Sequence, residues 1–174
     1  MAHSKNPPPI YRFITGHSEG GESVFEPRVT SEVPIKEYPG GMRIAFCFAT
    51  QGFPVDLEDD KDLGACEQLA NYPPGKMIPN GTAAKLIDFP PGYPSPMHRS
   101  MSINYNFVIE GQVECISDSG ETRLLKQGDF LMQRAVMHSW RNTSGTTWAK
   151  ITTVVFPVKS FAVDGKTLEA RPPQ

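Results

Sequence analysis

The feature that most constrains the fold is a change of pattern near residue 82. From there on, short apolar stretches alternate with turn-forming residues. The apolar stretches are 82–89, 102–117, 122–134, 138–142 and 147–158, and the turn-forming segments are 90–92, 118–120, 126–129 and 143–146. Short strands joined by tight turns are typical of an antiparallel β-sandwich or barrel. The sequence therefore predicts an all-β fold for this part of the chain.

The first 80 residues follow a different pattern. Three consecutive prolines, Pro7 to Pro9, remove backbone donors and predict an extended arm. Residues 55–71 begin with acidic residues and continue with apolar side chains at three-residue spacing, which predicts one short amphipathic helix. We expect one structural domain, divided into an N-terminal extension with arm, edge strands and helix (1–80), a barrel (81–160) and a C-terminal tail (161–174).

The composition limits the kinds of partner that we expect for this protein. The net charge is -2, and the lysines and arginines are scattered, so no basic stripe for nucleic acid is present. The chain has no apolar run of about 18 residues and no apolar leader, so we expect no membrane partner and a cytoplasmic location. The three cysteines are widely spaced without a CxxC pair, which predicts reduced thiols rather than a disulfide framework or a thiolate zinc site.

Two spaced motifs carry the functional signal. In the first, Gly92 is followed by His98, Ser100, Asn104 and Gly111 at fixed intervals. In the second, Gly128 is followed by His138 and Asn142, without the proline-glycine pair expected between them. This spacing resembles the two motifs of the cupins, which are small jelly-roll barrels. The resemblance implies an all-β cupin-type jelly-roll barrel with an N-terminal extension that contains a short helix.

A closer resemblance extends over most of the chain. Residues 90–105, 108–114 and 120–142, together with 11–17 upstream, look like a subgroup of small single-domain fungal cupins found beside genes for secondary metabolism. The resemblance implies a homodimer with a small-molecule substrate pocket. It does not specify a reaction, because one fold supports many activities.

A first interpretation of the function concerns the four positions that hold metal ligands in metal-binding cupins. Three imidazoles and a carboxylate are replaced here by His98, Ser100, Asn104 and His138. A hydroxyl and an amide are poor substitutes for these ligands. Under this reading, a divalent metal (Zn, Fe, Mn, Ni or Cu) is held by His98 and His138, with Gln133, Asn104 or water completing the shell, and the protein is a metal-dependent oxygenase.

A second reading, which we favour, needs no metal. Histidine titrates near neutral pH and can move protons, while hydroxyl and amide groups can stabilise a developing enolate. The predicted catalytic residues are His98, His138, Asn104 and Ser100, and the predicted substrate-binding residues are Gln133, Tyr93, Phe107 and Met132. The expected reaction is a lyase or isomerase step: decarboxylation, dehydration or cyclisation of an aromatic or polyketide-like carbonyl compound. A third reading is a non-catalytic binding protein.

Overall fold

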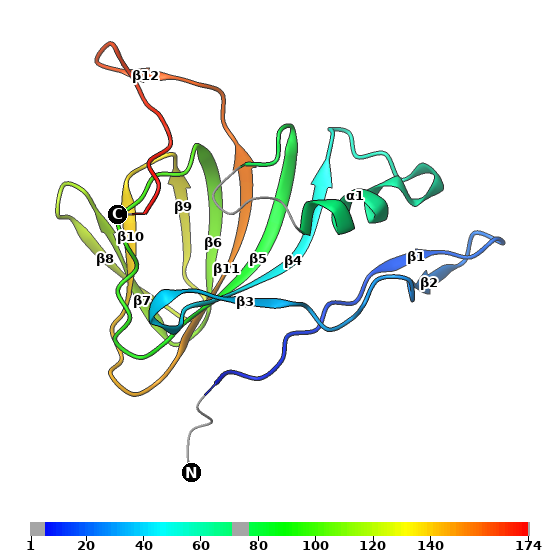
Figure 1. Cartoon of the computed structure of the whole chain (residues 1–174), viewed down its shortest axis with the longest axis horizontal. Coiled ribbons are helices and arrows are strands. Elements are labelled where there is room, and N and C mark those ends of the chain that lie inside the picture. The colour runs from blue at the N-terminus through cyan, green and yellow to red at the C-terminus, as the bar shows by residue number, and fades with distance from the viewer. Residues whose placement is uncertain (1–5, 71–76, 174) are drawn as a thin grey trace.

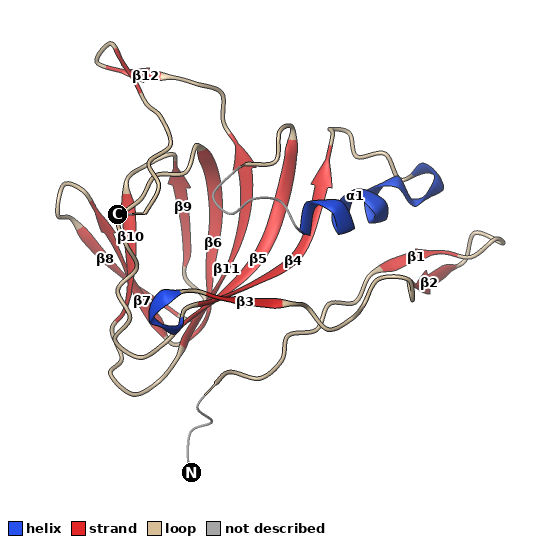
Figure 2. Ribbon diagram, in the orientation of Figure 1, coloured by secondary structure: helices blue, strands red, loops and turns tan. Residues whose placement is uncertain are grey.

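The computed structural model describes residues 6–70 and 77–173. Strands dominate its regular structure, so the all-β prediction is confirmed (Figure 2). The strands are β1 (Thr15–His17), β2 (Ser23–Phe25), β3 (Ile35–Glu37), β4 (Arg43–Gln51), β5 (Gly81–Phe89), β6 (Ser102–Glu110), β7 (Gln112–Ser117), β8 (Thr122–Lys126), β9 (Phe130–Arg134), β10 (His138–Asn142), β11 (Ala149–Pro157), β12 (Ala162–Val163) and β13 (Lys166–Thr167). The helical segments are η1 (Pro39–Gly41), η2 (Glu58–Asp60) and α1 (Lys61–Ala70).

Two antiparallel sheets form the body of the molecule. The larger sheet has six strands in the order β3-β4-β5-β11-β6-β9, and the smaller has three in the order β10-β7-β8. Figure 1 shows the smaller sheet beside the curved larger one. We call the region where side chains of the two sheets meet the interior. Strand β11 lies between β5 and β6, so neighbours in the sheet come from distant parts of the chain. Two packed antiparallel sheets are the architecture of a jelly roll.

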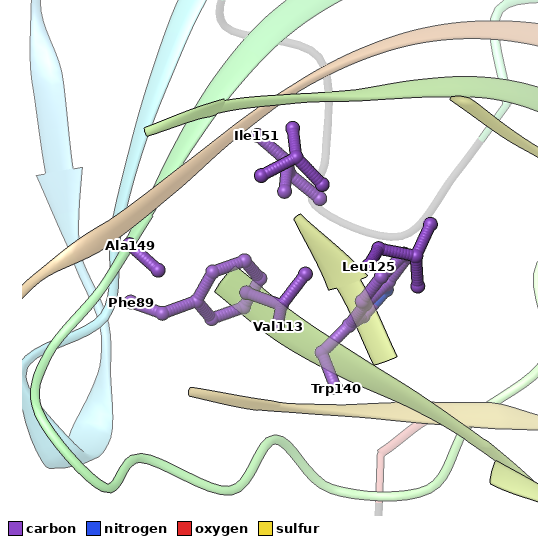
Figure 3. Close-up of a cluster of buried hydrophobic side chains, with 7 residues drawn as sticks. Phe89, Val113, Leu125, Trp140, Ala149 and Ile151 are labelled. Carbon is purple, nitrogen blue, oxygen red and sulfur yellow. The ribbon is translucent and has the colours of Figure 1, made fainter. Parts of the chain in front are cut away.

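An apolar cluster fills part of the interior (Figure 3). Its seven buried members come from both sheets: Phe89, Val108, Val113, Leu125, Trp140, Ala149 and Ile151. Because side chains alternate along a strand, each of these residues marks which positions of its strand point inward. Trp140 on β10 and Phe89 on β5 have ring centroids 6.4 Å apart. The cluster therefore ties the smaller sheet to the larger one and fixes the inner face of each strand.

The N-terminal arm packs on the opposite, outer face of the larger sheet. Ile10 and Val33 from the arm pack against Ala45 of β4 in a separate buried cluster. The Arg43 guanidinium donates a hydrogen bond of 3.0 Å to the backbone oxygen of Pro7. The extension also supplies β3 and β4 to the six-stranded sheet, so it forms part of the same body as the later strands.

The predicted helix is present but begins later than expected. Asp59 and Asp60 have φ values of 53° and 54°, in the left-handed region, so the α-helix starts only at Lys61. Leu69 packs against Ala49 and Ala83 of the larger sheet. Residue 71 of the predicted helical segment lies outside the described residues. Within the part of the chain that the structure describes, no helix is long and apolar enough to cross a membrane.

Candidate functional site

The structure brings the two motif histidines into direct contact. His138 is the first residue of β10, and His98 precedes β6 in an isolated bridge. Each backbone N–H donates to the other residue's carbonyl oxygen at 2.9 Å. The ring centroids lie 4.3 Å apart. His138 shares the inward direction of Trp140, two residues further along the strand, so the pair borders the interior.

Both imidazoles are held in the same tautomer. His98 Nδ1 lies 3.0 Å from the Pro96 carbonyl oxygen, and His138 Nδ1 lies 3.0 Å from that of Val136. A carbonyl oxygen only accepts hydrogen bonds, so each Nδ1 must carry the proton. In the neutral ring the lone pair is then on Nε2. The Nε2 lone pair of each ring can accept a proton or bind an electrophile.

The electrostatics of His138 favour its neutral form. Burial, assisted by the nearby His98, lowers the pKa of His138 from 6.5 to about 4, and the hydrogen bond to the Val136 carbonyl opposes this only in part. The side chain is almost fully buried, which explains why desolvation dominates. At neutral pH, His138 is therefore an uncharged base.

A network of neutral polar side chains crosses the interior. Gln133 Oε1 on β9 accepts hydrogen bonds from Asn106 Nδ2 at 3.1 Å and from Asn104 Nδ2 at 3.5 Å. On the other side of its amide, Gln133 Nε2 donates to Cys115 Sγ of β7 at 3.6 Å. Ser102 donates to Asn104 Oδ1 at 2.7 Å. Gln133 thus connects the two sheets, and the predicted residues Asn104 and Gln133 do lie together.

Ser100 does not lie on the regular strand that the prediction assumed. The prediction assumed a regular strand, on which His98 and Ser100 would project to the same side. The chain instead makes only isolated bridges here, His98 with His138 and Arg99 with Arg171, and β6 begins at Ser102. The side chain that reaches Asn104 is that of Ser102, which is buried.

Three predicted substrate-binding residues lie apart from the histidines and the amide network. Phe107 and Met132 are 42% and 47% exposed and alternate with the inward residues Asn106 and Gln133, so they project from the outer face of the larger sheet. Tyr93 packs against the apolar cluster, 6.3 Å from Phe89. We therefore leave these three out of the candidate site.

Several polar residues of the interior were not predicted from the sequence. Ser102, Asn106 and Cys115 belong to the amide network, and Lys85 and Thr153 occupy the inner face of the neighbouring strands β5 and β11. The inward position of Lys85 could have been predicted from the alternation of side chains along β5, because Lys85 lies on the same side of the strand as Ile87 and Phe89. A lysine at an inward-facing strand position is unusual and points to a special role.

Comparisons with known proteins identify the class. No family model matches the chain. Phomopsin biosynthesis cluster protein D of Diaporthe leptostromiformis is 38% identical over 157 residues, which are 90% of this chain and 83% of the relative. The cupin-domain-containing oxidoreductase fogC of Aspergillus ruber is 35% identical over 165 residues, which are 92% of this chain and 78% of the relative.

The solved structures agree on the fold. The Schizosaccharomyces pombe Cnp3 cupin domain is 14% identical, covers 85% of this chain and 88% of its own, and superposes with a TM-score of 0.52. With the sequence relatives, this likeness confirms the cupin-type jelly roll. The chain belongs to the cupin-domain proteins of fungal biosynthesis clusters.

The residues present do not fit the metal site of metal-binding cupins. Among residues 6–70 and 77–173, no group of three His, Cys, Asp or Glu side chains is placed to hold a metal ion. Gln133, the predicted third ligand, already accepts hydrogen bonds with its amide oxygen, and Asn104 Oδ1 accepts from Ser102. Two imidazoles supply fewer strong metal ligands than the three imidazoles and one carboxylate of such a site. No step proposed below passes through a metal.

Proposed function

We propose that this cupin is a small-molecule enzyme of secondary metabolism that catalyses a lyase or isomerase step on an aromatic or polyketide-like carbonyl compound. The observation that carries the proposal is the paired histidines, each with Nδ1 bound to a carbonyl oxygen and Nε2 left as the acceptor. The relatives are named as biosynthesis cluster proteins, which supports a role in secondary metabolism. The small-molecule substrate, the homodimer and the cytoplasmic location stay predictions.

His138 is the proposed general base. It is neutral at physiological pH, and the Val136 carbonyl fixes the direction of its ring. Its Nε2 takes a proton from the carbon next to the substrate carbonyl, and a positioned base of this kind typically accelerates such a step about 100- to 10,000-fold. His138 then returns that proton to the product, and the ring of His98, with its centroid 4.3 Å away, packs against the ring of His138.

The amide network stabilises the enolate that forms. Asn104 and Gln133 each have a second N–H in their NH2 groups besides the one bound within the network. Donors held in place before the reaction stabilise negative charge on the carbonyl oxygen without reorganisation. Because the network itself is neutral, it adds no competing charge near the base.

Deuterium exchange tests this proposal without knowledge of the natural substrate. Aryl alkyl ketones are incubated with the protein in D2O, and loss of the proton signal next to the carbonyl is followed by NMR. We expect the protein to accelerate exchange of at least one ketone, and His138→Ala to slow it about 100-fold or more. His17→Ala, which removes an exposed histidine of β1, is the matched control and should exchange like the wild type.

Two outcomes would contradict the proposal. One is an unchanged exchange rate in His138→Ala. The other is tight binding of the ketones with exchange no faster than in buffer, which would instead support a non-catalytic binding protein.

An oxidoreductase is the second candidate function. The relatives fogC, srdB and virC are each named as a cupin-domain-containing oxidoreductase. Metal analysis of protein prepared without an affinity tag separates the two candidates. About one equivalent of metal, lost in a His98→Ala and His138→Ala double variant but kept in His17→Ala, would favour the oxidoreductase.

A further inference from the structure

Lys85 projects into the interior from the centre of the larger sheet. It pairs with Thr153 of β11 and with Phe46 of β4, and Thr153 in turn pairs with Asn106 of β6. Directly paired residues of antiparallel strands project to the same side. Asn106 reaches Gln133 within the interior network, so Lys85 and Thr153 face the same space.

Neither of these two side chains has a partner among residues 6–70 and 77–173. Within the part of the chain that the structure describes, the Lys85 ammonium makes no ion pair or hydrogen bond, whereas Lys150 on the outer face lies 3.5 Å from Asp88. The Thr153 hydroxyl is buried, with the residue only 5% exposed, and has no hydrogen-bond partner. A buried hydroxyl is normally paired, so the unpaired Thr153 hydroxyl beside an inward-facing lysine points to a ligand that these two side chains bind.

The environment also makes Lys85 a suitable nucleophile. Burial lowers the pKa of its ammonium group, because the charged form is poorly solvated there. A larger fraction of neutral amine is then present near neutral pH than at an exposed lysine. Desolvated lysines with this property react with carbonyl groups.

We propose that Lys85 binds the carbonyl substrate covalently as an imine, with the Thr153 hydroxyl donating a hydrogen bond to the carbonyl oxygen during attack. This inference rests on the proposed function, because it assumes a carbonyl substrate. It assigns to the larger sheet a reactive group that complements the histidine pair at β10.

The chemistry needs no oxidant or reductant. The ε-nitrogen lone pair forms a bond to the carbonyl carbon, the C=O π electrons move to oxygen, and that oxygen gains the proton that nitrogen loses. The resulting carbinolamine loses its hydroxyl and a further proton as water, leaving a C=N bond. The imine nitrogen takes up a proton from water. The protonated imine, in place of the carbonyl oxygen, then accepts the electron pair released when His138 removes the adjacent proton or when a carboxylate leaves as CO2.

Reductive trapping tests the inference. The wild-type protein is incubated with benzaldehyde and sodium cyanoborohydride near pH 7.5, and the modified lysines are located by peptide mass spectrometry. We expect Lys85 to be labelled at least about tenfold faster than the exposed Lys36 or Lys166. Labelling of Lys85 no faster than of these lysines would overturn the inference, and this readout needs no variant that must fold.

Variants extend the test. Lys85→Arg keeps the positive charge but cannot form an imine, so the fast label should disappear, while Lys166→Arg should leave it unchanged. Thr153→Val should slow labelling of Lys85 several-fold.

Ketone exchange measured on Lys85→Arg separates the two proposals. Exchange equal to the wild type would overturn the role of Lys85 and leave the proposal of His138 as the base unaffected. Fast labelling of Lys85 without exchange in the wild type would contradict the histidine base alone.

Discussion

The low pKa of His138 predicts a specific loss of stability in mild acid. In the unfolded chain a histidine binds a proton below about pH 6.5, whereas folded His138 binds it only near pH 4. Between these values the unfolded state holds more protons, so the free energy of unfolding falls as the pH is lowered through this window. The change in pKa corresponds to about 3 kcal/mol, reached near pH 4 and constant below it.

Urea unfolding of the wild type and of His138→Gln at several pH values between 7.5 and 4 measures this effect. The wild type should lose about 3 kcal/mol more than the variant over that range, because glutamine does not titrate. Other titrating groups, such as Asp88, whose pKa burial raises, are common to both proteins and cancel. His17→Gln should behave like the wild type. Parallel stability curves for the wild type and His138→Gln would refute the reasoning.

The remaining predictions concern the fold and the assembly. Gly111→Ala should lower the free energy of unfolding in urea by about 1–3 kcal/mol, because φ is 70° and a Cβ would lie 3.0 Å from the Trp148 backbone oxygen. Gly145→Ala is the control, because a Cβ there would lie in open space. Equal stabilities of the two variants would contradict this account. Light scattering should give a mass of twice 19.2 kDa for the predicted homodimer. A mass of 19.2 kDa would contradict this prediction.

The sequence alone located the strands and the two histidines well, because both depend on local spacing. Turn residues punctuate the second half of the chain, and the motif spacing placed His98 and His138 on neighbouring segments. The start of the helix was not predictable in the same way. The start depends on the left-handed backbone conformation of Asp59 and Asp60. No pattern in the sequence predicts that conformation at these two positions.

The inward-facing residues of the larger sheet were predicted less well, for a physical reason. Composition and proximity in sequence favoured Phe107 and Met132, yet the alternation of a strand places them opposite Asn106 and Gln133. The same alternation predicts that the Lys85 side chain points inward. The hydrogen bonds that fix both imidazole tautomers come from the carbonyls of loop residues, whose backbone conformation is not encoded in any local pattern.

The measurement that tests the central claim most directly is ketone exchange by protein from which metal has been removed. The protein is treated with a chelator, its metal content is measured, and exchange is compared with that of untreated wild type and of His138→Ala. If His138 acts as a base without a metal, the metal-free protein should exchange as fast as the untreated one, and His138→Ala about 100-fold or more slowly. Loss of exchange on chelation, with recovery when a divalent metal is returned, would contradict the account.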